Sequence, residues 1–244
     1  MKRVLAIDMG NTSTKYALFE DEVLSASWSH PTGDTATAAS PILEQTDAPV
    51  ALSSVVPQHA AAIQDWCAQH GRKLFSIDSG KQSIISGTEG KLGADLVSAA
   101  VAALKLYGNG GAVLVLALGT ATTITAVAAD GSFRGCQFTL GLGGTLETLA
   151  ARCALLPGVS EDLKEVSLGF DTESAMRNGT LLAHVGIVEA WIAKAREQLG
   201  TKAAVVVTGG WSGTVAAHTK AFDHVDRDLT LKGIRILAEA AEQG

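Results

Sequence analysis

The chain contains 244 residues with a formal net charge of −6, and no cluster of Lys and Arg offsets this acidic balance. Nucleic acid and anionic membranes are therefore disfavoured as partners. The three cysteines, Cys67, Cys136 and Cys153, are odd in number and lack C-x-x-C spacing, which disfavours a disulfide framework and a zinc site. The first residues lead into a strand without the apolar core of a signal peptide, so we expect a cytoplasmic protein.

The first part of the chain alternates between strand and helix patterns. Three strands are predicted near 3–8, 14–20 and 22–28, then a short helix within 29–46, a strand at 50–56, a helix from Pro57 to Gly71 and a strand at 74–77. This β-β-β-α-β-α-β succession is typical of a ribonuclease-H-like lobe, in which helices flank parallel strands. We expect this lobe to cover residues 1–110.

The first turn of this lobe lies in Asp8-Met-Gly-Asn-Thr-Ser-Thr-Lys15. Its backbone N–H groups, hydroxyls and ammonium group suit phosphate oxygens, and Asp8 suits a magnesium ion, bound directly or through water. The candidates for binding phosphate are Gly10, Asn11, Thr12 and Lys15. The alternative is a β-hairpin in which Asp, Gly and Asn only serve the turn. We predict a site for nucleotide phosphates.

A second copy of this turn favours the functional interpretation. Aligning Asp8 with Ala117 superposes Gly10 on Gly119, and the second turn again lies between two apolar stretches. Such a repeat predicts a second, similar lobe at residues 111–244, facing the first across a central nucleotide cleft. This architecture resembles the acetate and sugar kinase/Hsp70/actin superfamily, so the predicted fold is α/β and actin-like. The later elements expected are helices at 145–155, 175–199 and 229–242, and a strand before Thr208-Gly-Gly210.

Asp95 lies in the first turn of an Ala-rich helix that is predicted to start near Ala94, after a glycine-punctuated loop. A carboxylate there is favoured by the helix dipole whether or not it takes part in chemistry. Beside a cleft, the same carboxylate could accept the proton of a substrate hydroxyl. The spacing alone leaves both interpretations open.

Five collinear segments resemble the signatures of type III pantothenate kinases. They are Asp8–Lys15, Gly93-Ala-Asp-Leu96, Gly119-Thr-Ala-Thr-Thr123, Gly135–Gly141, which is similar to the family's G-G-x-I-x-P-G turn, and Asp171–Gly179. The match spans most of the chain. The resemblance implies a small-molecule kinase that phosphorylates pantothenate to 4'-phosphopantothenate with ATP and Mg²⁺, the first step of coenzyme A biosynthesis.

The resemblance also implies a role for each matching residue. Asp8 to Lys15 would hold the ATP phosphates and magnesium, and Thr120 would contact ATP. Asp95 would be the catalytic base. The pantothenate pocket would be lined by Gly93, Ala94, Asp95, Leu96 and Thr172. The family's pocket lies near a subunit interface, so the resemblance implies a homodimer.

Four positions depart from the family's pattern. Leu96 replaces an arginine that would pair with an anionic substrate group. Ala117 replaces an aspartate tied to a monovalent cation, so we expect that cation site to be lost. Ser86 stands in place of a tyrosine, and Leu140 in place of a proline. These departures leave an alternative function open: a catalytically impaired nucleotide-binding homologue that acts as an accessory or regulatory protein.

Overall fold

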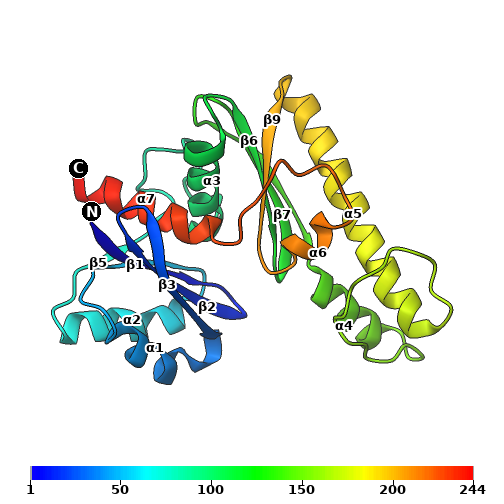
Figure 1. Cartoon of the computed structure of the whole chain (residues 1–244), viewed down its shortest axis with the longest axis horizontal. Helices are drawn as coiled ribbons and strands as arrows, with labels where there is room; N and C mark the ends of the chain where they lie inside the picture. Colours follow the sequence, from blue (N-terminus) through cyan, green and yellow to red (C-terminus); the bar gives the residue numbers. More distant parts are fainter. Residues whose placement is uncertain (1, 244) are drawn as a thin grey trace. The chain divides into compact units, whose positions relative to one another are not determined.

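The computed structural model describes residues 2–243, and the chain divides into two compact units (Figure 1). The first unit runs to Leu106 and resumes at Asp228, and the second covers Tyr107–Arg227. Each unit is built on a five-stranded sheet with both parallel and antiparallel pairs. The predicted α/β architecture is thereby confirmed. The predicted boundary near residue 110 agrees with the end of the first segment of unit one. The predicted second lobe also included the chain from Asp228 onward, which instead packs with the first unit.

The first sheet has the strand order β3-β2-β1-β4-β5. Its central strand β1 pairs antiparallel with β2 and parallel with β4, so the carboxyl ends of β1 and β4 lie side by side. The strands are β1 (Arg3–Met9), β2 (Ser13–Glu20), β3 (Val23–Pro31), β4 (Val50–Ser54) and β5 (Leu74–Ser76). The helices that begin in this unit are η1 (Thr32–Asp34), α1 (Thr35–Leu43), α2 (Pro57–Gln69), α3 (Ala94–Tyr107) and α7 (Leu229–Gln243).

The alternation of side chains along β1 explains how helices cover the first sheet. Leu5, Ile7 and Met9 are buried together with side chains of α1 and α2. Val4 and Ala6 point the other way and are buried together with side chains of α7. Because successive side chains of a strand alternate between faces, Asp8 lies on the α7 face, at the end of an otherwise apolar row. The strand thus presents a carboxyl group on this face, near its carboxyl end.

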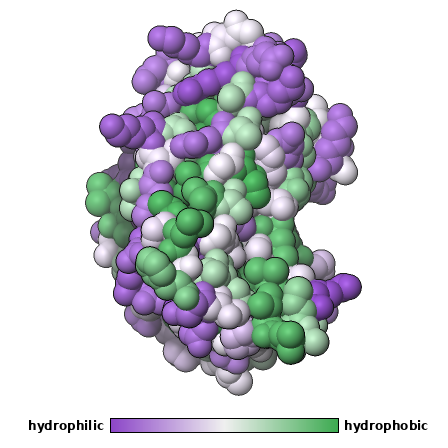
Figure 2. Space-filling view, turned by 90° about the vertical axis from the view of Figure 1, so that its right-hand side faces the viewer, coloured by the Kyte–Doolittle hydropathy of each residue, from purple (hydrophilic) through white to green (hydrophobic). Residues whose placement is uncertain are grey.

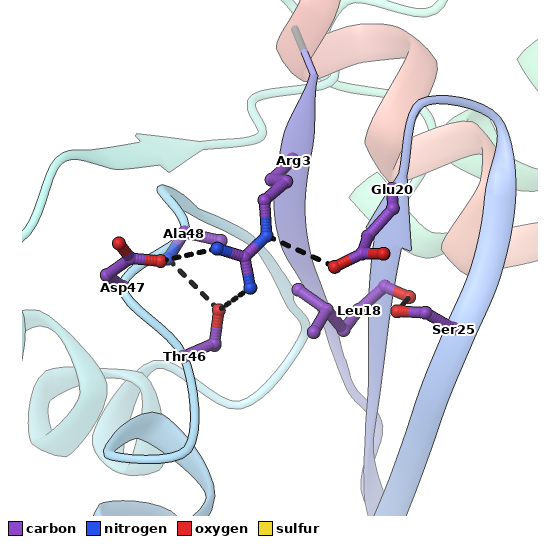
Figure 3. Close-up of polar contacts among 7 residues, drawn as sticks. All are labelled: Arg3, Leu18, Glu20, Ser25, Thr46, Asp47 and Ala48. Carbon is purple, nitrogen blue, oxygen red and sulfur yellow. Dashed lines mark hydrogen bonds and ion pairs between the residues drawn. The ribbon is translucent and has the colours of Figure 1, made fainter.

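Arg3 fixes the opposite end of β1 (Figure 3). Its guanidinium donates to Asp47 Oδ1 at 2.7 Å and to Thr46 Oγ1 at 3.3 Å, and its Nε lies 3.3 Å from Glu20 Oε1. These contacts join the start of β1 to the end of β2 and to the loop before β4. The groups are largely exposed, so each ion pair contributes only about 0–1 kcal/mol to stability.

The second sheet has the strand order β10-β9-β6-β7-β8. β6 and β7 are antiparallel neighbours joined by the second predicted turn, and β9 pairs in parallel with β6. The strands are β6 (Ala112–Leu118), β7 (Ala121–Val127), β8 (Phe133–Leu140), β9 (Ala203–Thr208) and β10 (His224–Val225). The helices are α4 (Leu142–Arg152), α5 (Thr172–Leu199) and α6 (Ser212–Ala216). Leu114, Leu116 and Leu118 of β6 are buried in one core with side chains of these three helices.

Two expectations about the second unit were wrong. Gly135–Gly141, which resembles a turn of the family, is mostly the edge strand β8, whose exposed side chains give no clear strand pattern. The helix predicted from residue 145 begins at Leu142, because Gly143 and Gly144 are helical. The two apolar stretches that flank the second turn form β6 and β7. Among the described residues, no helix has the length and apolar character needed to span a membrane.

Candidate active site

The turn after β1 is held by hydrogen bonds from buried threonines, and two of its polar side chains are exposed. Thr32 Oγ1 donates to Gly10 O at 2.7 Å and lies 3.1 Å from Thr14 Oγ1. Thr14 is fully buried, so its hydroxyl supports the turn and does not face a ligand. The expectation that all hydroxyls of this turn suit phosphate oxygens is therefore wrong for Thr14. Asn11 and Thr12 are exposed at the tip. The turn therefore offers a ligand its backbone and these two side chains.

Asp8 lies in a row with one residue from each neighbouring strand. The register pairs Asp8 with Lys15 of β2 and with Ser53 of β4. Burial raises the pKa of Asp8 to about 7, the Asp95 carboxylate raises it as well, and the Lys15 ammonium lowers it. A carboxylate that is poorly solvated and only partly neutralised gains much from a bound cation. Asp8 therefore fits the role of a ligand for a divalent metal.

Asp95 occupies the first turn of α3, as predicted. Burial raises the pKa of the Asp95 carboxyl, although backbone N–H groups of Leu96 and of Asp95 itself hydrogen-bond to it and lower that pKa. The carboxylate folds back over Gly93, where an added Cβ would lie 2.5 Å from Asp95 Oδ1 and 3.4 Å from Val55 Cγ1. A larger residue at position 93 would therefore displace the Asp95 carboxylate. Because Gly93 also lies close to Val55, the start of α3 with Asp95 lies beside the segment that follows β4.

Gln82 organises the loop that leads from β5 to Gly93, a role that the sequence did not reveal. Its Oε1 accepts the N–H groups of Ile84 at 2.9 Å and Ile85 at 2.8 Å. Its Nε2 donates to Ile85 O at 2.6 Å and Thr88 Oγ1 at 3.2 Å. No sequence motif signals this arrangement, because most of the partners are backbone groups that meet only in the folded loop.

The second turn, at the end of β6, is enclosed by glycines from two other segments. A Cβ on Gly141 would overlap the carbonyl oxygens of Gly119 and Thr120, and the Gly141 N–H donates to Thr120 O at 2.9 Å. Gly209, with φ of 97°, approaches the backbone of Leu118 equally closely. Such contacts between backbones require residues without a Cβ. Thr120 is left exposed at the tip of this glycine-rich junction.

Two of the positions that depart from the family's pattern, Leu96 and Ala117, lie in ordinary apolar or strand environments. Leu96 is buried in the first unit and offers no charge to an anionic substrate. Ala117 stands between Thr123 and Thr208 in the register of β6, β7 and β9. Thr123 Oγ1 is buried without a hydrogen-bond partner in the part of the chain that the structure describes. The side-chain oxygens beside Ala117 thus come from threonines, not from a carboxylate.

Thr172 is the first residue of α5, and its side chain is exposed. Asp171 caps this helix, because its Oδ1 accepts the Ser174 N–H at 2.7 Å while its own N–H donates to Ser174 Oγ at 3.2 Å.

The predicted site residues fall into two groups, one in each unit. The first unit brings together Asp8, Lys15, Gly93 and Asp95, and the second unit carries Ala117, Thr120 and Thr172.

Comparison with known proteins identifies the family. A family model described as type III pantothenate kinase matches residues 4–194. The chain belongs to the type III pantothenate kinase family. The type III pantothenate kinase of Anaeromyxobacter dehalogenans (strain 2CP-C) is 31% identical over 252 residues, which cover 97% of this chain and 98% of that protein. The family resemblance inferred from the sequence is thereby confirmed.

Solved structures with little sequence identity share the fold. A Campylobacter jejuni protein described as a Baf family transcriptional activator has a TM-score of 0.62 at 15% identity, over 98% of this chain and 100% of that one. The inorganic polyphosphate/ATP-glucomannokinase of Arthrobacter sp. strain KM has a TM-score of 0.54 at 14% identity, over 100% of both chains. These similarities confirm the predicted actin-like, ribonuclease-H-like architecture of the type III pantothenate kinase fold.

Proposed function

We propose that this protein transfers the γ-phosphoryl group of ATP to the primary hydroxyl of pantothenate, which gives 4'-phosphopantothenate, the first step of coenzyme A biosynthesis. Membership of the type III pantothenate kinase family supports this reaction. Within the structure, the observation that supports it best is the placement of two carboxyl groups, Asp8 near the end of β1 and Asp95 in the first turn of α3, such that the charge of Asp95 raises the pKa of Asp8. Phosphoryl transfer needs one group that manages charge and one that activates a hydroxyl.

Asp95 is the proposed base. Its carboxylate accepts the proton of the pantothenate hydroxyl as the hydroxyl oxygen forms a bond to the γ-phosphorus, and the bond from that phosphorus to the bridging oxygen of ADP breaks. Burial raises the pKa of Asp95, which makes the carboxylate a stronger proton acceptor than an exposed aspartate. The hydrogen bonds from the first turn of α3 hold it in place. Positioning and charge neutralisation would supply most of the remaining acceleration.

The nucleotide would be held by the two turns. In the first, the backbone around Gly10 and the side chains of Asn11, Thr12 and Lys15 provide hydrogen-bond donors for phosphate oxygens. In the second, Thr120 would contact ATP. Magnesium, when bound, offsets the phosphate charge, and Asp8 is the residue that would hold it, because its carboxyl group is buried and only partly neutralised by Lys15.

Pantothenate would be held by Gly93, Ala94, Asp95 and Leu96 at the start of α3, and by Thr172 at the start of α5. Because Leu96 is buried and uncharged, the anionic group of pantothenate would be recognised by hydrogen bonds instead of by an arginine at this position. At Ala117, we propose that no carboxylate-based site for a monovalent cation operates. Threonine hydroxyls are weaker replacements, so activity should depend little on potassium.

We also propose that the enzyme works as a homodimer in the cytoplasm, where ATP is available. Large apolar side chains around α5 support the dimer. Leu155, Leu168 and Phe170 have exposed fractions of 94%, 90% and 104%. Figure 2 shows the right-hand side of the view in Figure 1, where hydrophobic groups form several patches among hydrophilic ones. Exposed patches of this kind are common in surfaces that bind another protein.

The decisive experiment measures ADP release from ATP with pantothenate, other primary alcohols or no acceptor. We expect turnover with pantothenate and none without an acceptor. Asp95→Asn should bind ADP as the native protein does, yet lower kcat by about 10²–10⁴-fold, because the hydroxyl loses its base. Glu89→Gln is the matched control: it removes an exposed carboxylate from the preceding loop and should leave kcat unchanged.

Two results would contradict this proposal. Unchanged kcat in Asp95→Asn would mean that Asp95 only stabilises the start of α3. Binding of ATP without turnover on pantothenate would instead favour a nucleotide-binding homologue with an accessory or regulatory role, for which Leu96 and Ala117 are the supporting departures.

A further inference from the structure

Ser53 is a buried polar residue of the first unit without a structural function in the fold. Its side chain is fully buried, and its Oγ has no hydrogen-bond partner within residues 2–243. Leaving a buried hydroxyl unpaired costs stability, and most buried hydroxyls in proteins are paired. Alanine would fit the same space without this cost. The hydroxyl therefore calls for a partner that is not part of the protein chain.

The strand register identifies what Ser53 faces. Ser53 of β4 pairs directly with Asp8 of β1, and Asp8 pairs with Lys15 of β2. Residues opposite each other on neighbouring strands point to the same face, about 5 Å apart. The buried residues agree with this placement. Ala51, two residues before Ser53, and Ala6, two residues before Asp8, are buried in the same cluster, on the face of the sheet that α7 covers. Ser53 and Asp8 are thus neighbours on one face of the sheet, each following the buried alanine of its own strand.

Asp95 approaches the same place from α3. The added Cβ at Gly93 would contact both Asp95 Oδ1 and Val55 Cγ1, so the start of α3 lies against the residues that follow Ser53. Asp95 also interacts electrostatically with Asp8. Two carboxyl groups and a hydroxyl without a partner among the described residues therefore lie near the carboxyl ends of β1 and β4. An arrangement of oxygen atoms that a single ammonium group, that of Lys15, neutralises only in part suits a hydrated hard metal ion.

We propose that Ser53 is a positioning residue of the magnesium–nucleotide site, where its hydroxyl hydrogen-bonds to a water of the hydrated cation that Asp8 holds. This inference rests on the proposed function, since the cation is the one that accompanies ATP. Magnesium keeps several of its waters when it binds proteins, and those waters need oxygen partners. Ser53 supplies one from β4, while Asp8 supplies the charge. The unpaired hydroxyl is then satisfied in the working enzyme and unsatisfied only in the free protein.

The test uses the full chain and compares Ser53→Ala with Thr125→Val. Thr125 Oγ1 is also buried and has no hydrogen-bond partner among the described residues, but it lies on β7 of the second unit. Thermal unfolding without metal measures the fold, and calorimetry with ADP at increasing Mg²⁺ measures the site. Neither variant should lower the melting temperature of the metal-free protein, because each removes an unsatisfied group. Ser53→Ala should raise the Mg²⁺ concentration for half-maximal ADP binding by about tenfold. Thr125→Val should leave it unchanged.

Further readouts separate positioning from a general loss of structure. Ser53→Cys, whose thiol fills the space but hydrogen-bonds weakly, should fall between alanine and the native residue. The KM for pantothenate at saturating Mg²⁺ should stay within about twofold in Ser53→Ala, because the effect concerns the cation. An unchanged Mg²⁺ requirement overturns the proposal. A Ser53→Ala chain that does not fold overturns it too, because the hydroxyl would then support the fold.

The outcomes also distinguish this inference from the proposed function. A native protein that binds ADP with Mg²⁺ but does not phosphorylate pantothenate would refute the kinase activity, and the effect of Ser53→Ala on binding would still decide the role of Ser53. A native protein that turns over pantothenate while Ser53→Ala keeps the same Mg²⁺ requirement would leave the kinase reaction intact and refute the role of Ser53.

Discussion

Asp8 differs from the exposed aspartates of this chain in what surrounds its carboxyl group. The carboxyls of Asp78, Asp130 and Asp171 accept local hydrogen bonds from turns or a helix start, which hold the pKa of each below its usual range. Burial instead raises the pKa of Asp8 to about 7, with Asp95 as the second cause. The first three carboxylates serve local structure. Asp8 is held in a state that disfavours its own charge, which is typical of a functional group.

This environment predicts how the metal-free protein responds to pH. Between the unfolded pKa of 3.8 and the folded pKa of about 7, the unfolded chain loses the Asp8 proton while the folded protein keeps it. Stability should therefore fall as pH rises through this window, by at most about 1.4 kcal/mol per pH unit, and this contribution should level off above it. Asp8→Asn should make the fall less steep. The measurement is the free energy of unfolding from pH 4 to 8 with a chelator present.

Asp65→Asn is the control for that experiment, because Asp65 is exposed on α2. Its slope with pH should match that of the native protein. If Asp8→Asn gives the same slope as the native protein, the surroundings of Asp8 do not penalise its charge. The case for Asp8 as a metal ligand would then lose its electrostatic support.

At the scale of elements, the sequence predicts the first unit well. Alternating apolar residues fix β1 and β2, Pro57 marks the start of α2, and Gly93 precedes α3 where predicted. The second unit is harder because β8 is an edge strand with exposed side chains, so burial imposes no pattern on it. The last helix, predicted at 229–242 and observed as Leu229–Gln243, is recognisable as an element, but its packing on β1 depends on contacts that are distant in sequence.

The residues of the candidate site likewise divide into those that the sequence reveals and those that it hides. Asp8, Lys15 and Asp95 are recognisable because charged residues interrupt apolar runs and occur in motifs. Ser53 is hidden, because a small residue inside an apolar strand looks like ordinary core, and only the parallel register places it beside Asp8. Gln82 is hidden for a different reason. Its partners are mainly backbone groups of the loop, and a glutamine in a polar loop carries no signal of its own.

The loop that Gln82 organises gives a prediction at this scale. Gln82→Ala leaves the N–H groups of Ile84 and Ile85 without their acceptor, so we expect a loss of about 1–3 kcal/mol in the free energy of unfolding. Because the loop leads into Gly93 and Asp95, the KM for pantothenate should rise several-fold while ADP affinity stays unchanged. Gln64→Ala, on the exposed side of α2, is the control. Equal KM values in both variants would show that the loop does not position the start of α3.

At the scale of the whole molecule, the chain enters and leaves the second unit through two segments that are tied to each other. The Tyr107 hydroxyl donates to Asp226 Oδ2 at 2.7 Å, and the rings of Tyr107 and His224 lie 4.6 Å apart. Burial, followed by the Asp226 contacts, raises the pKa of Tyr107 to about 12. The hydroxyl therefore stays a donor at neutral pH. The two ends of the second unit are thus fixed side by side, next to the points where the chain passes to the first unit.

The second unit also carries the surface that we assign to a second copy of the chain. Two segments with exposed apolar residues are held against α5 by contacts within the unit. Ser167 O accepts from Asn178 Nδ2 at 3.0 Å, which fixes the segment with Leu168 and Phe170. A ring nitrogen of His184 lies 3.0 Å from Leu140 O, at the end of the edge strand β8. Exposed apolar groups fixed in this way keep their positions for a partner, and they cost solubility if none binds.

The dimer proposal is tested by making this surface polar. Leu168→Ser combined with Phe170→Ser should convert a dimer into a monomer, because both side chains are fully exposed and their change leaves the core intact. Light scattering after size exclusion measures the mass across a range of concentrations. Val23→Ser, which removes a 68% exposed apolar side chain from the first unit, should leave the dimer unchanged. Since Thr172 lies two residues after Phe170, the monomer should also show a higher KM for pantothenate. An unchanged mass for the double variant, or a monomeric native protein, would refute an interface at this surface.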